Sequence, residues 1–448
     1  MIVDSVLTNA KAYLQKEIVE CSIAVEKGKI FKIGKETHMP NADEKMNLEN
    51  LLVLPGLIDV HVHLRDEGKA NKEDFYTGTA AAAAGGMTTV LDMPNNNPTT
   101  MTAEILKNRI QIAERRILVN VGFYSEFPKD LNEVKSIVDQ GAVAFKLFMA
   151  QQVGGLNIDD DKALQDAFTK AGETGVPVAV HAEDKEMLSR QEEKLKRANR
   201  HDTKAFLKAH SKEVELKAVE RLLNISKQVE MKLHFCHTTT KEGLEAIIEV
   251  KKSGAKVTCE VTPQHLLLSS SDFERYGSML TMMPPLRDQN HIEALWKGVN
   301  EGWIDVIGSD HAPHILSEKS DASIWEVKVG IPGLETTLPL MLTMVRKRRL
   351  SLARMVQLLS ERPAEIFNLR NRGGLEQGRQ ADIVVIDFNK KFIIDSSKFQ
   401  SKAKYSPFDG WEVQGMPVKT FVNGSLIMED QEIVAKAGKG RIIRRNGT

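Results

Sequence analysis

Eight short apolar segments alternate with longer helical segments over most of this 448-residue chain. The apolar segments are LPGLIDVHVHL, MTTVLDMP, ILVNVGFY, AVAFKLFM, VPVAVHAE, MKLHFCHT, KVTCEVTP and WIDVIGSD. Apolar residues at helical spacing lie between them, as in 104–116 and 213–229, and a stretch around 352–359 supplies the eighth helix. Eight strand–helix units in series predict an α/β fold, the (β/α)₈ or TIM barrel.

The two ends of the chain lack this alternation. Residues 1–52 contain short strand-like pieces with a turn at Lys27-Gly28-Lys29, and residues 373–448 contain others, such as ADIVVIDF and VKTFVNGSLIM. Neither end is long enough to bury a core of its own. We therefore expect both ends to pair into one small β-sandwich, with a barrel of residues 53–372 between them.

Composition limits the partners. The 61 basic and 61 acidic residues leave a formal net charge of +0, which argues against binding nucleic acid or an acidic membrane. Cys21, Cys236 and Cys259 show no Cys-x-x-Cys spacing, so we expect neither a disulfide framework nor a zinc knuckle. The first residues lack the pattern of a signal peptide, and no run of about 18 apolar residues occurs. We expect a cytoplasmic protein.

Two histidines stand two residues apart in the first apolar segment, DVHVHLR. Residues i and i+2 of a strand point to the same face, so His61 and His63 can offer two imidazole nitrogens to one metal ion. His-x-His also occurs on ordinary strands. The other polar residues at strand ends favour the metal site, because barrel enzymes carry their chemistry there.

Lys146 lies in the very apolar segment GAVAFKLFM. A protonated ammonium is costly in such surroundings, which favours the neutral amine. A neutral amine can react with carbon dioxide to give a carbamate, a carboxylate-like anion able to bridge two metal ions. The alternative is a lysine whose charge is paired with a carboxylate inside the barrel.

His181, His237 and Asp310 close the fifth, sixth and eighth apolar segments. A single histidine in such a place is often a hydrogen-bonded core residue, but two on adjacent strands that face a His-x-His pair indicate ligands. Asp310 adds an acidic ligand that can also transfer a proton. Imidazole with carboxylate suits zinc, and manganese or cobalt could be accommodated. Cys236, beside His237, fits a buried structural thiol better than a further ligand.

Three further polar residues follow barrel strands. Arg65 lies just past the histidine pair, Asn95 follows Asp92-Met93-Pro94, and His314 comes four residues after Asp310. An arginine, an amide and an imidazole near one point suit the recognition of a carboxylate, which arginine can bind bidentately. Alternatively, Arg65 pairs with a neighbouring acidic residue and Asn95 caps a turn.

Several longer motifs, taken as a set, resemble the dihydroorotase family of the amidohydrolase superfamily. They are DVHVHLR, KEDFYTGTAAAAAGGMTTVLDMPNNNP, VAVHAED, CHTTTKEG, VTCEVTPQHL, GSDHAPH and PGLETTLPL. The resemblance covers nearly the whole chain, including PAEIFNL and the late segment SPFDGWEVQG.

This resemblance implies a binuclear zinc centre with a bridging hydroxide, and it assigns residues to each role. The first metal would be bound by His61, His63 and Asp310, the second by His181 and His237, with a carbamate on Lys146, formed from CO₂, as the bridge. The carboxylate-binding residues of the family correspond to Arg65, Asn95 and His314, with backbone contacts near Gly330.

The resemblance also implies a reaction. It is the reversible cyclisation of N-carbamoyl-L-aspartate to L-dihydroorotate with loss of water, a step of pyrimidine synthesis. Asp310 would carry the proton between the attacking hydroxide and the leaving nitrogen. The substrate is then a small anion, while a homodimer or a complex with a pathway enzyme stays open.

The chain departs from the family pattern at two places. Asp66-Glu67-Gly68 follows Arg65 where the family commonly reads Glu-Pro-Gly, and Met283 stands where a polar residue usually precedes Pro284. These departures leave the shape of one loop and one substrate contact open. The polar segment between His314 and Gly330 is long enough to act as a lid.

Other functions remain as alternatives. The segment around Lys146 also resembles hydantoinases and allantoinases. Hydantoinases usually lack an arginine at the position of Arg65 and carry a tyrosine near Gln151, while SDHAPH and Asn95 fit dihydroorotase better than allantoinase. The third alternative is a non-catalytic scaffold relative, which would be expected to have lost metal ligands, and this chain keeps all six.

Overall fold

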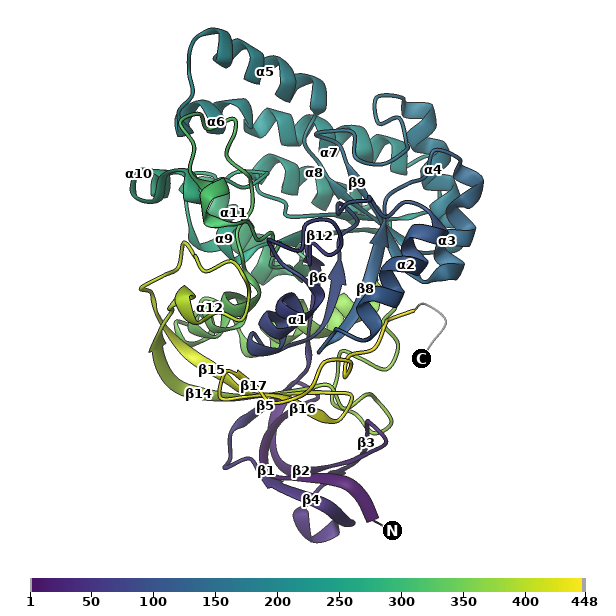
Figure 1. The fold of residues 1–448 in the computed structure, drawn as a ribbon, viewed down its shortest axis with the longest axis vertical. Helices are drawn as coiled ribbons and strands as arrows, with labels where there is room; N and C mark the ends of the chain where they lie inside the picture. The colour runs from purple at the N-terminus through teal and green to yellow at the C-terminus, as the bar shows by residue number, and fades with distance from the viewer. Residues whose placement is uncertain (1, 445–448) are drawn as a thin grey trace.

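The computed structural model describes residues 2–444 and contains a barrel above a terminal β-domain (Figure 1). The barrel strands coincide with the eight apolar segments. They are β6 (Leu57–Val62), β7 (Met87–Asp92), β8 (Asn120–Ser125), β9 (Ala142–Phe148), β10 (Pro177–His181), β11 (Lys232–Phe235), β12 (Val257–Val261) and β13 (Val306–Ile307). The strands are parallel and pair in chain order. The barrel closes where the N–H of His63 donates to the carbonyl of His311, at 2.8 Å. The predicted fold class is confirmed.

Every residue of strands β6 to β10 is buried. Strands covered on both faces need apolar residues at successive positions, which is why these segments read as continuous apolar runs instead of alternating ones. A polar side chain in such a strand therefore requires a specific partner.

Helices follow the strands and cover the outside of the barrel (Figure 1). They are α1 (Phe75–Ala84), α2 (Ala103–Glu114), α3 (Val134–Gln140), α4 (Asp161–Thr174), α5 (Lys185–Arg197), α6 (Thr203–Ala209), α7 (Lys212–Ser226), α8 (Lys241–Lys252), α9 (Pro263–Leu267), α10 (Phe273–Tyr276), α11 (Gln289–Glu301), α12 (Leu334–Arg346), α13 (Leu352–Val356) and α14 (Arg362–Ile366). Helices α2 and α7 occupy two of the predicted ranges. The helix expected around 352–359 is α13 continued by a π-helical turn, Gln357–Glu361, and α12 precedes it.

Helix α1 shows how local sequence sets these elements. Its N-cap residue Asp74 accepts hydrogen bonds from the backbone N–H groups of Tyr76 and Thr77. The alanine run makes the helix narrow enough to pack closely on the barrel, and the helix ends at Gly85.

The terminal β-domain is one nine-stranded sheet built from both ends of the chain. Its order is β17-β16-β15-β14-β5-β1-β2-β3, with β4 beside β1. The strands are β1 (Ile2–Leu14), β2 (Glu17–Glu26), β3 (Lys29–Gly34), β4 (Asn41–Asn47), β5 (Leu52–Pro55), β14 (Ile383–Ile393), β15 (Glu412–Val422), β16 (Ser425–Glu429) and β17 (Glu432–Ile433). Residues from both ends, such as Leu7, Ile23, Val53, Ile383 and Phe421, share one apolar core.

The chain passes from this sheet into the barrel at Gly56. Strand β5 pairs with β1 and β14, and β6 begins at Leu57. A Cβ atom at Gly56 would lie 2.2 Å from Oγ1 of Thr88, so only glycine allows the close approach of the two strands.

A late segment of the chain returns to the mouth of the barrel. Ser401 Oγ hydrogen-bonds to Glu73, and the hydroxyl of Tyr405 lies 3.4 Å from the carbonyl of Gly330. The terminal domain therefore contributes side chains beside the predicted substrate site. None of the helices in the described range 2–444 has the length and apolar content needed to cross a membrane.

Candidate active site

The structure gathers the six predicted ligands at the mouth of the barrel. Oδ1 of Asp310 lies 3.3 Å from Nε2 of His61 and 3.3 Å from Nε2 of His63. The rings of His61 and His237 are 5.2 Å apart between centroids, and Nδ1 of His181 lies 3.1 Å from Nε2 of His237. His61, in β6, and His63, just past its end, thus face the same side, as the strand period predicted.

One group of these residues has the spacing of a metal site. His61, His63 and Asp310 each offer one ligand atom, and the three atoms lie within 4.8 Å of one another. Two imidazoles and a carboxylate form a donor set that suits zinc and related divalent ions. The residues therefore fit the metal that the sequence predicts.

Hydrogen bonds orient three of the histidines. Nδ1 of His61 contacts Glu260, Nδ1 of His63 lies 2.7 Å from Oδ1 of Asn95, and Nε2 of His181 lies 2.9 Å from Glu183. Each ring therefore has one nitrogen held by an oxygen atom and the other nitrogen directed into the cluster. This arrangement fixes the tautomer and is typical of histidines that bind metal ions.

Burial sets the charge of the ligands. It lowers the pKa of His63 to about 3 and holds the pKa of His237 well below its usual value, so both rings are neutral, the form that binds metal. Burial is the largest single effect on His61 and acts to lower its pKa, but the neighbouring anionic groups, with Glu260 first and Asp310 after it, together raise that pKa to about 10. A metal ion at His61 therefore competes with a proton.

The part of the cluster around His237 and Lys146 contains a buried polar atom without a hydrogen-bond partner among the described residues. Nδ1 of His237 is buried and has no hydrogen-bond partner among residues 2–444. The nearby Lys146 is fully buried, with Nζ 3.0 Å from Sγ of Cys236. Buried polar groups without partners are rare, so this region fits a further bound group.

Three residues of the site have strained backbones. Arg65, His237 and Asp310 adopt φ angles of 62°, 32° and 46°, in the left-handed region that non-glycine residues seldom occupy. Such conformations cost free energy and cluster at functional sites, where they aim a side chain.

Arg65 and His314 lie side by side next to the cluster. Nη2 of Arg65 is 3.3 Å from Nε2 of His314, and Nε of Arg65 donates to the carbonyl of Pro313 at 3.2 Å. The neighbouring Asp66 pairs with Arg116 instead of Arg65. In the described part of the chain, no carboxylate lies within ion-pair distance of Arg65, although Arg65 is only 7% exposed.

The other two predicted substrate residues occupy different places. Asn95 uses its side-chain oxygen to hold His63, which is a role that the turn sequence Asn95-Asn96-Asn97-Pro98 did not indicate. Gly330 lies at the end of the segment predicted as a lid, and its N–H donates to the carbonyl of Thr281. Met283 packs against an apolar cluster that includes Ile324 and Val327 of the same segment.

Two carboxylates of the site, Glu260 and Glu183, were not predicted from the sequence. Glu260 contacts His61, lies 3.2 Å from Nε2 of His234 and accepts from the backbone N–H of His237. Glu183 holds His181 on one oxygen and His210 on the other, at 2.7 Å. The available signal was an acidic residue inside or directly after an apolar strand, since a buried carboxylate needs a partner.

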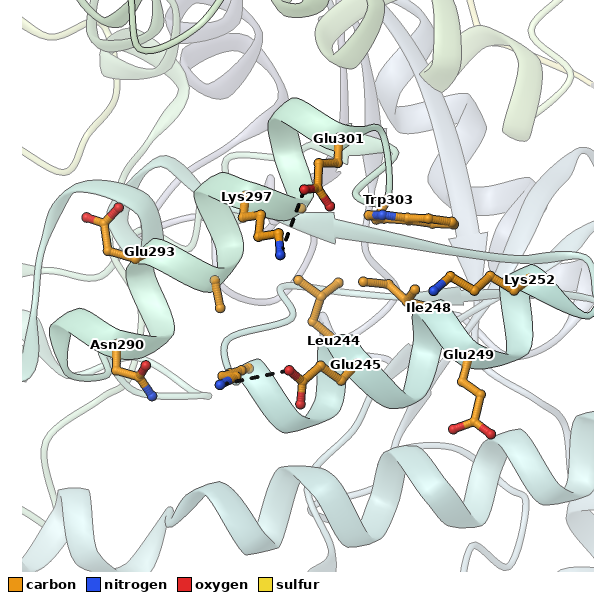
Figure 2. A pocket seen from close by; sticks show the side chains of 13 residues that line it. Leu244, Glu245, Ile248, Glu249, Lys252, Asn290, Glu293, Lys297, Glu301 and Trp303 are labelled. Carbon is orange, nitrogen blue, oxygen red and sulfur yellow. Dashed lines mark ion pairs between the residues drawn. The ribbon is translucent and has the colours of Figure 1, made fainter.

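A surface groove on the outer wall of the barrel has no part in this chemistry. Figure 2 shows this groove between α8 and α11, with Leu244, Ile248 and Trp303 at its floor and charged side chains at its rim. Its ion pairs, Lys241 to Glu245 and Lys297 to Glu301, each lie within one helix at i, i+4 spacing. The groove is lined by three lysines and four glutamates, and by none of the predicted site residues.

A (β/α)₈ barrel whose mouth gathers imidazoles, a lysine and a carboxylate is the arrangement of a metal-dependent hydrolase. Comparison with known proteins agrees: the model described as "Amidohydrolase family" matches residues 52–427. The chain belongs to the amidohydrolase family and is a cyclic amide hydrolase.

Similar proteins include two archaeal dihydroorotases and one solved hydantoinase. The dihydroorotase of Methanothermobacter thermautotrophicus is 40% identical over 94% of this chain and 94% of its own length. That of Methanosarcina acetivorans is 36% identical over 98% of this chain and 95% of its own. The structure of L-hydantoinase (dihydropyrimidinase) from Arthrobacter aurescens superposes with a TM-score of 0.95 at 33% identity, covering 99% of this chain and 100% of that one.

Proposed function

We propose that this chain is a dihydroorotase, which converts N-carbamoyl-L-aspartate to L-dihydroorotate and water and catalyses the reverse hydrolysis. The observation that carries the proposal is the buried guanidinium of Arg65, which has no carboxylate partner among the described residues and adjoins His314. A buried cation without a counter-ion is costly unless a ligand supplies the anion. Dihydroorotate differs from other cyclic ureides in having a ring carboxylate.

The protonation of His314 supports an anion at this point. Burial lowers the pKa of His314 to about 3, so the ring is neutral with a single N–H. Lys72 Nζ and Oε2 of Glu318 both lie 3.2 Å from Nδ1, and the carbonyl of Val329 lies 3.0 Å from Nε2. Because Lys72 also pairs with Glu318 and can satisfy that carboxylate, we assign the proton to Nε2, where it donates to Val329. The Nε2–H of His314 and the guanidinium of Arg65 then lie side by side, and a carboxylate bound beside them can accept from both groups.

We further propose that the site holds two Zn²⁺ ions. His61, His63 and Asp310 would bind one ion, His181 and His237 the other, and a carbamate on Lys146 would bridge them. When bound, the ions supply Lewis-acid polarisation of the amide carbonyl and activation of the attacking water. The residues fit this role because their free nitrogens face one another and Nδ1 of His237 has no partner among residues 2–444.

The remaining chemistry belongs to the side chains. In hydrolysis, Asp310 accepts the proton of the attacking water and delivers it to the ring nitrogen as the amide C–N bond breaks. In ring closure the same carboxylate takes the proton from that nitrogen, and water leaves. Arg65 and His314 hold the substrate carboxylate, and Asn95 keeps His63 in its tautomer throughout.

A hydantoinase is the second candidate, because the solved L-hydantoinase superposes over nearly the whole chain. A hydantoin lacks the ring carboxylate, so it leaves Arg65 without a counter-ion. The test is a turnover assay of purified, zinc-supplemented protein on dihydroorotate, carbamoyl-aspartate, hydantoin and allantoin, with bound metal counted. Interconversion of the first pair supports the proposal. Turnover of hydantoin or allantoin alone overturns it, and a protein without metal or turnover would be a scaffold relative.

A further inference from the structure

Lys319 is fully buried in the segment between His314 and Gly330, at the end of a short 3₁₀ turn, Leu316–Lys319. Its Nζ donates hydrogen bonds to Oγ1 and the carbonyl of Thr281, at 2.9 and 3.0 Å. It also donates to the carbonyls of Lys328, at 2.9 Å, and Gly330, at 3.0 Å. Lysine is seldom fully buried without a paired charge. Within residues 2–444, Lys319 makes no ion pair.

The oxygen atoms around Nζ explain how the charge is tolerated. An ammonium has three N–H donors and a neutral amine only two, so a shell of four oxygens favours the charged form. Burial opposes this and lowers the pKa of Lys319 to about 7. The side chain therefore resembles a bound cation that ties the Thr281 loop to the segment 328–330.

The tied segment is the one that orients His314. The carbonyls of Lys328 and Gly330 both accept from Lys319, while the carbonyl of Val329, between them, accepts from Nε2 of His314 at 3.0 Å. Successive carbonyls of an extended chain point to opposite sides. Lys319 thus holds one side of a three-residue segment whose other side fixes the N–H of His314.

Gly330 makes this arrangement specific. Its φ is 141°, and a Cβ atom there would lie 2.5 Å from the carbonyl oxygen of Ala312. Its carbonyl accepts from Lys319, its N–H donates to Thr281, and the Tyr405 hydroxyl lies 3.4 Å from the same carbonyl. The segment is therefore fixed from three sides.

We propose that Lys319 is a positioning residue for substrate binding, which acts through Val329 to hold His314 as a hydrogen-bond donor beside Arg65. The inference rests on the proposed function, because it concerns the same carboxylate site. Lys319 does not touch substrate. Its loss is expected to weaken the binding of a carboxylate substrate and to leave the metal cluster intact.

The test replaces Lys319 by Met, which keeps the length of the side chain and removes its donors. Lys328→Met is the matched control, because it makes the same change at an exposed lysine of the same segment. We expect Lys319→Met to raise KM for dihydroorotate by about tenfold or more, with kcat changed less than about threefold and metal content unchanged. A KM within about twofold of the control overturns the proposal. So does a fall in kcat accompanied by loss of metal, which indicates a merely structural role.

A milder pair of variants covers the case in which Lys319→Met does not fold. Thr281→Val removes one of the four oxygens, and Thr281→Ser retains it. We expect KM to rise about threefold in the first and to stay unchanged in the second. Equal KM values in the two variants would contradict the proposal.

Hydrogen exchange separates this inference from the proposed function. If the parent does not turn over dihydroorotate, the proposed function fails, but the amide of Gly330 still reports on Lys319. We expect this amide to exchange about tenfold faster in Lys319→Met than in Lys328→Met. Equal exchange rates would overturn the positioning role whatever the substrate.

Discussion

Nη2 of Arg65 lies 3.3 Å from Nε2 of His314, and both side chains are buried beside the cluster of candidate metal ligands. With the proposed proton on Nε2 of His314, both groups are donors, and an anionic ligand that accepts from both would stabilise the pair. The neighbouring carboxylate of Asp66 does not provide that charge, because it pairs with Arg116.

Replacing Arg65 tests this relationship. Truncating one partner of a buried charge pair costs about 2–5 kcal/mol, so Arg65→Gln should lower kcat/KM for dihydroorotate by at least about 30-fold. Arg65→Lys keeps the charge but not the planar, bidentate geometry. Its kcat/KM should therefore lie between those of Arg65→Gln and the parent. Steady-state kinetics of the three proteins checks the order. Equal kcat/KM in Gln and parent would exclude carboxylate binding by Arg65.

Asp310 is the second test, because it lies 3.3 Å from both His61 and His63 and is the proposed proton carrier. Asp310→Asn keeps an oxygen ligand but cannot accept the proton. Turnover should fall by about 10²- to 10⁴-fold while metal remains bound, as measured by kinetics and metal analysis of one preparation. Turnover close to that of the parent would rule out this role.

Glu260 should control metal affinity. Its carboxylate contacts Nδ1 of His61 and accepts from the N–H of His237, so it orients ligands of both proposed ions. Glu260→Gln is expected to weaken zinc binding by about 10- to 100-fold in a competition titration with a chelator. Glu249→Gln, at an exposed position of α8, is the control. Indistinguishable zinc affinities in the two variants would contradict the assignment.

Glu126 gives a prediction on pH. This residue follows β8, and burial raises its pKa to about 8, with Oε1 lacking a hydrogen-bond partner among residues 2–444. Because the folded-state pKa lies above the unfolded value, the stabilisation is complete below the unfolded pKa and is lost as pH rises through 8. The loss can reach about 1.4 kcal/mol per pH unit. The free energy of unfolding of the parent and of Glu126→Gln should be measured with denaturant at several pH values. As pH rises, the parent should lose stability relative to the variant. Parallel plots of this free energy against pH would refute the prediction.

Much of the fold could be predicted from the sequence, because a strand that is buried on both faces needs apolar residues at successive positions. The eight barrel strands are continuous apolar runs, and the period of two residues in β6 placed His61 and His63 on one face. The topology of the terminal sheet was less accessible. Strand β5 joins β1 to β14 across more than half of the chain, and no local pattern in Leu52–Pro55 specifies that pairing.

The candidate ligands of the site could be predicted from the sequence, because histidine and aspartate side chains at the ends of barrel strands are groups that bind metal ions. The hydrogen-bond partners of those residues could not be predicted, because the sequence does not show toward which neighbour a buried carboxylate points. Glu260 is buried in strand β12, and only the structure shows that its carboxylate contacts His61. Asn95 illustrates the same limit, since its sequence context indicates a turn and its side chain holds His63.

The most direct measurement compares dihydroorotate with dihydrouracil, which has the same ring without the carboxylate. The zinc-loaded parent should show a kcat/KM for dihydroorotate at least about 10³-fold higher than for dihydrouracil, because buried groups left unpaired discriminate strongly. The ratio should fall sharply in Arg65→Gln. Equal or faster hydrolysis of dihydrouracil by the parent would contradict the account and make the chain a hydantoinase-type enzyme.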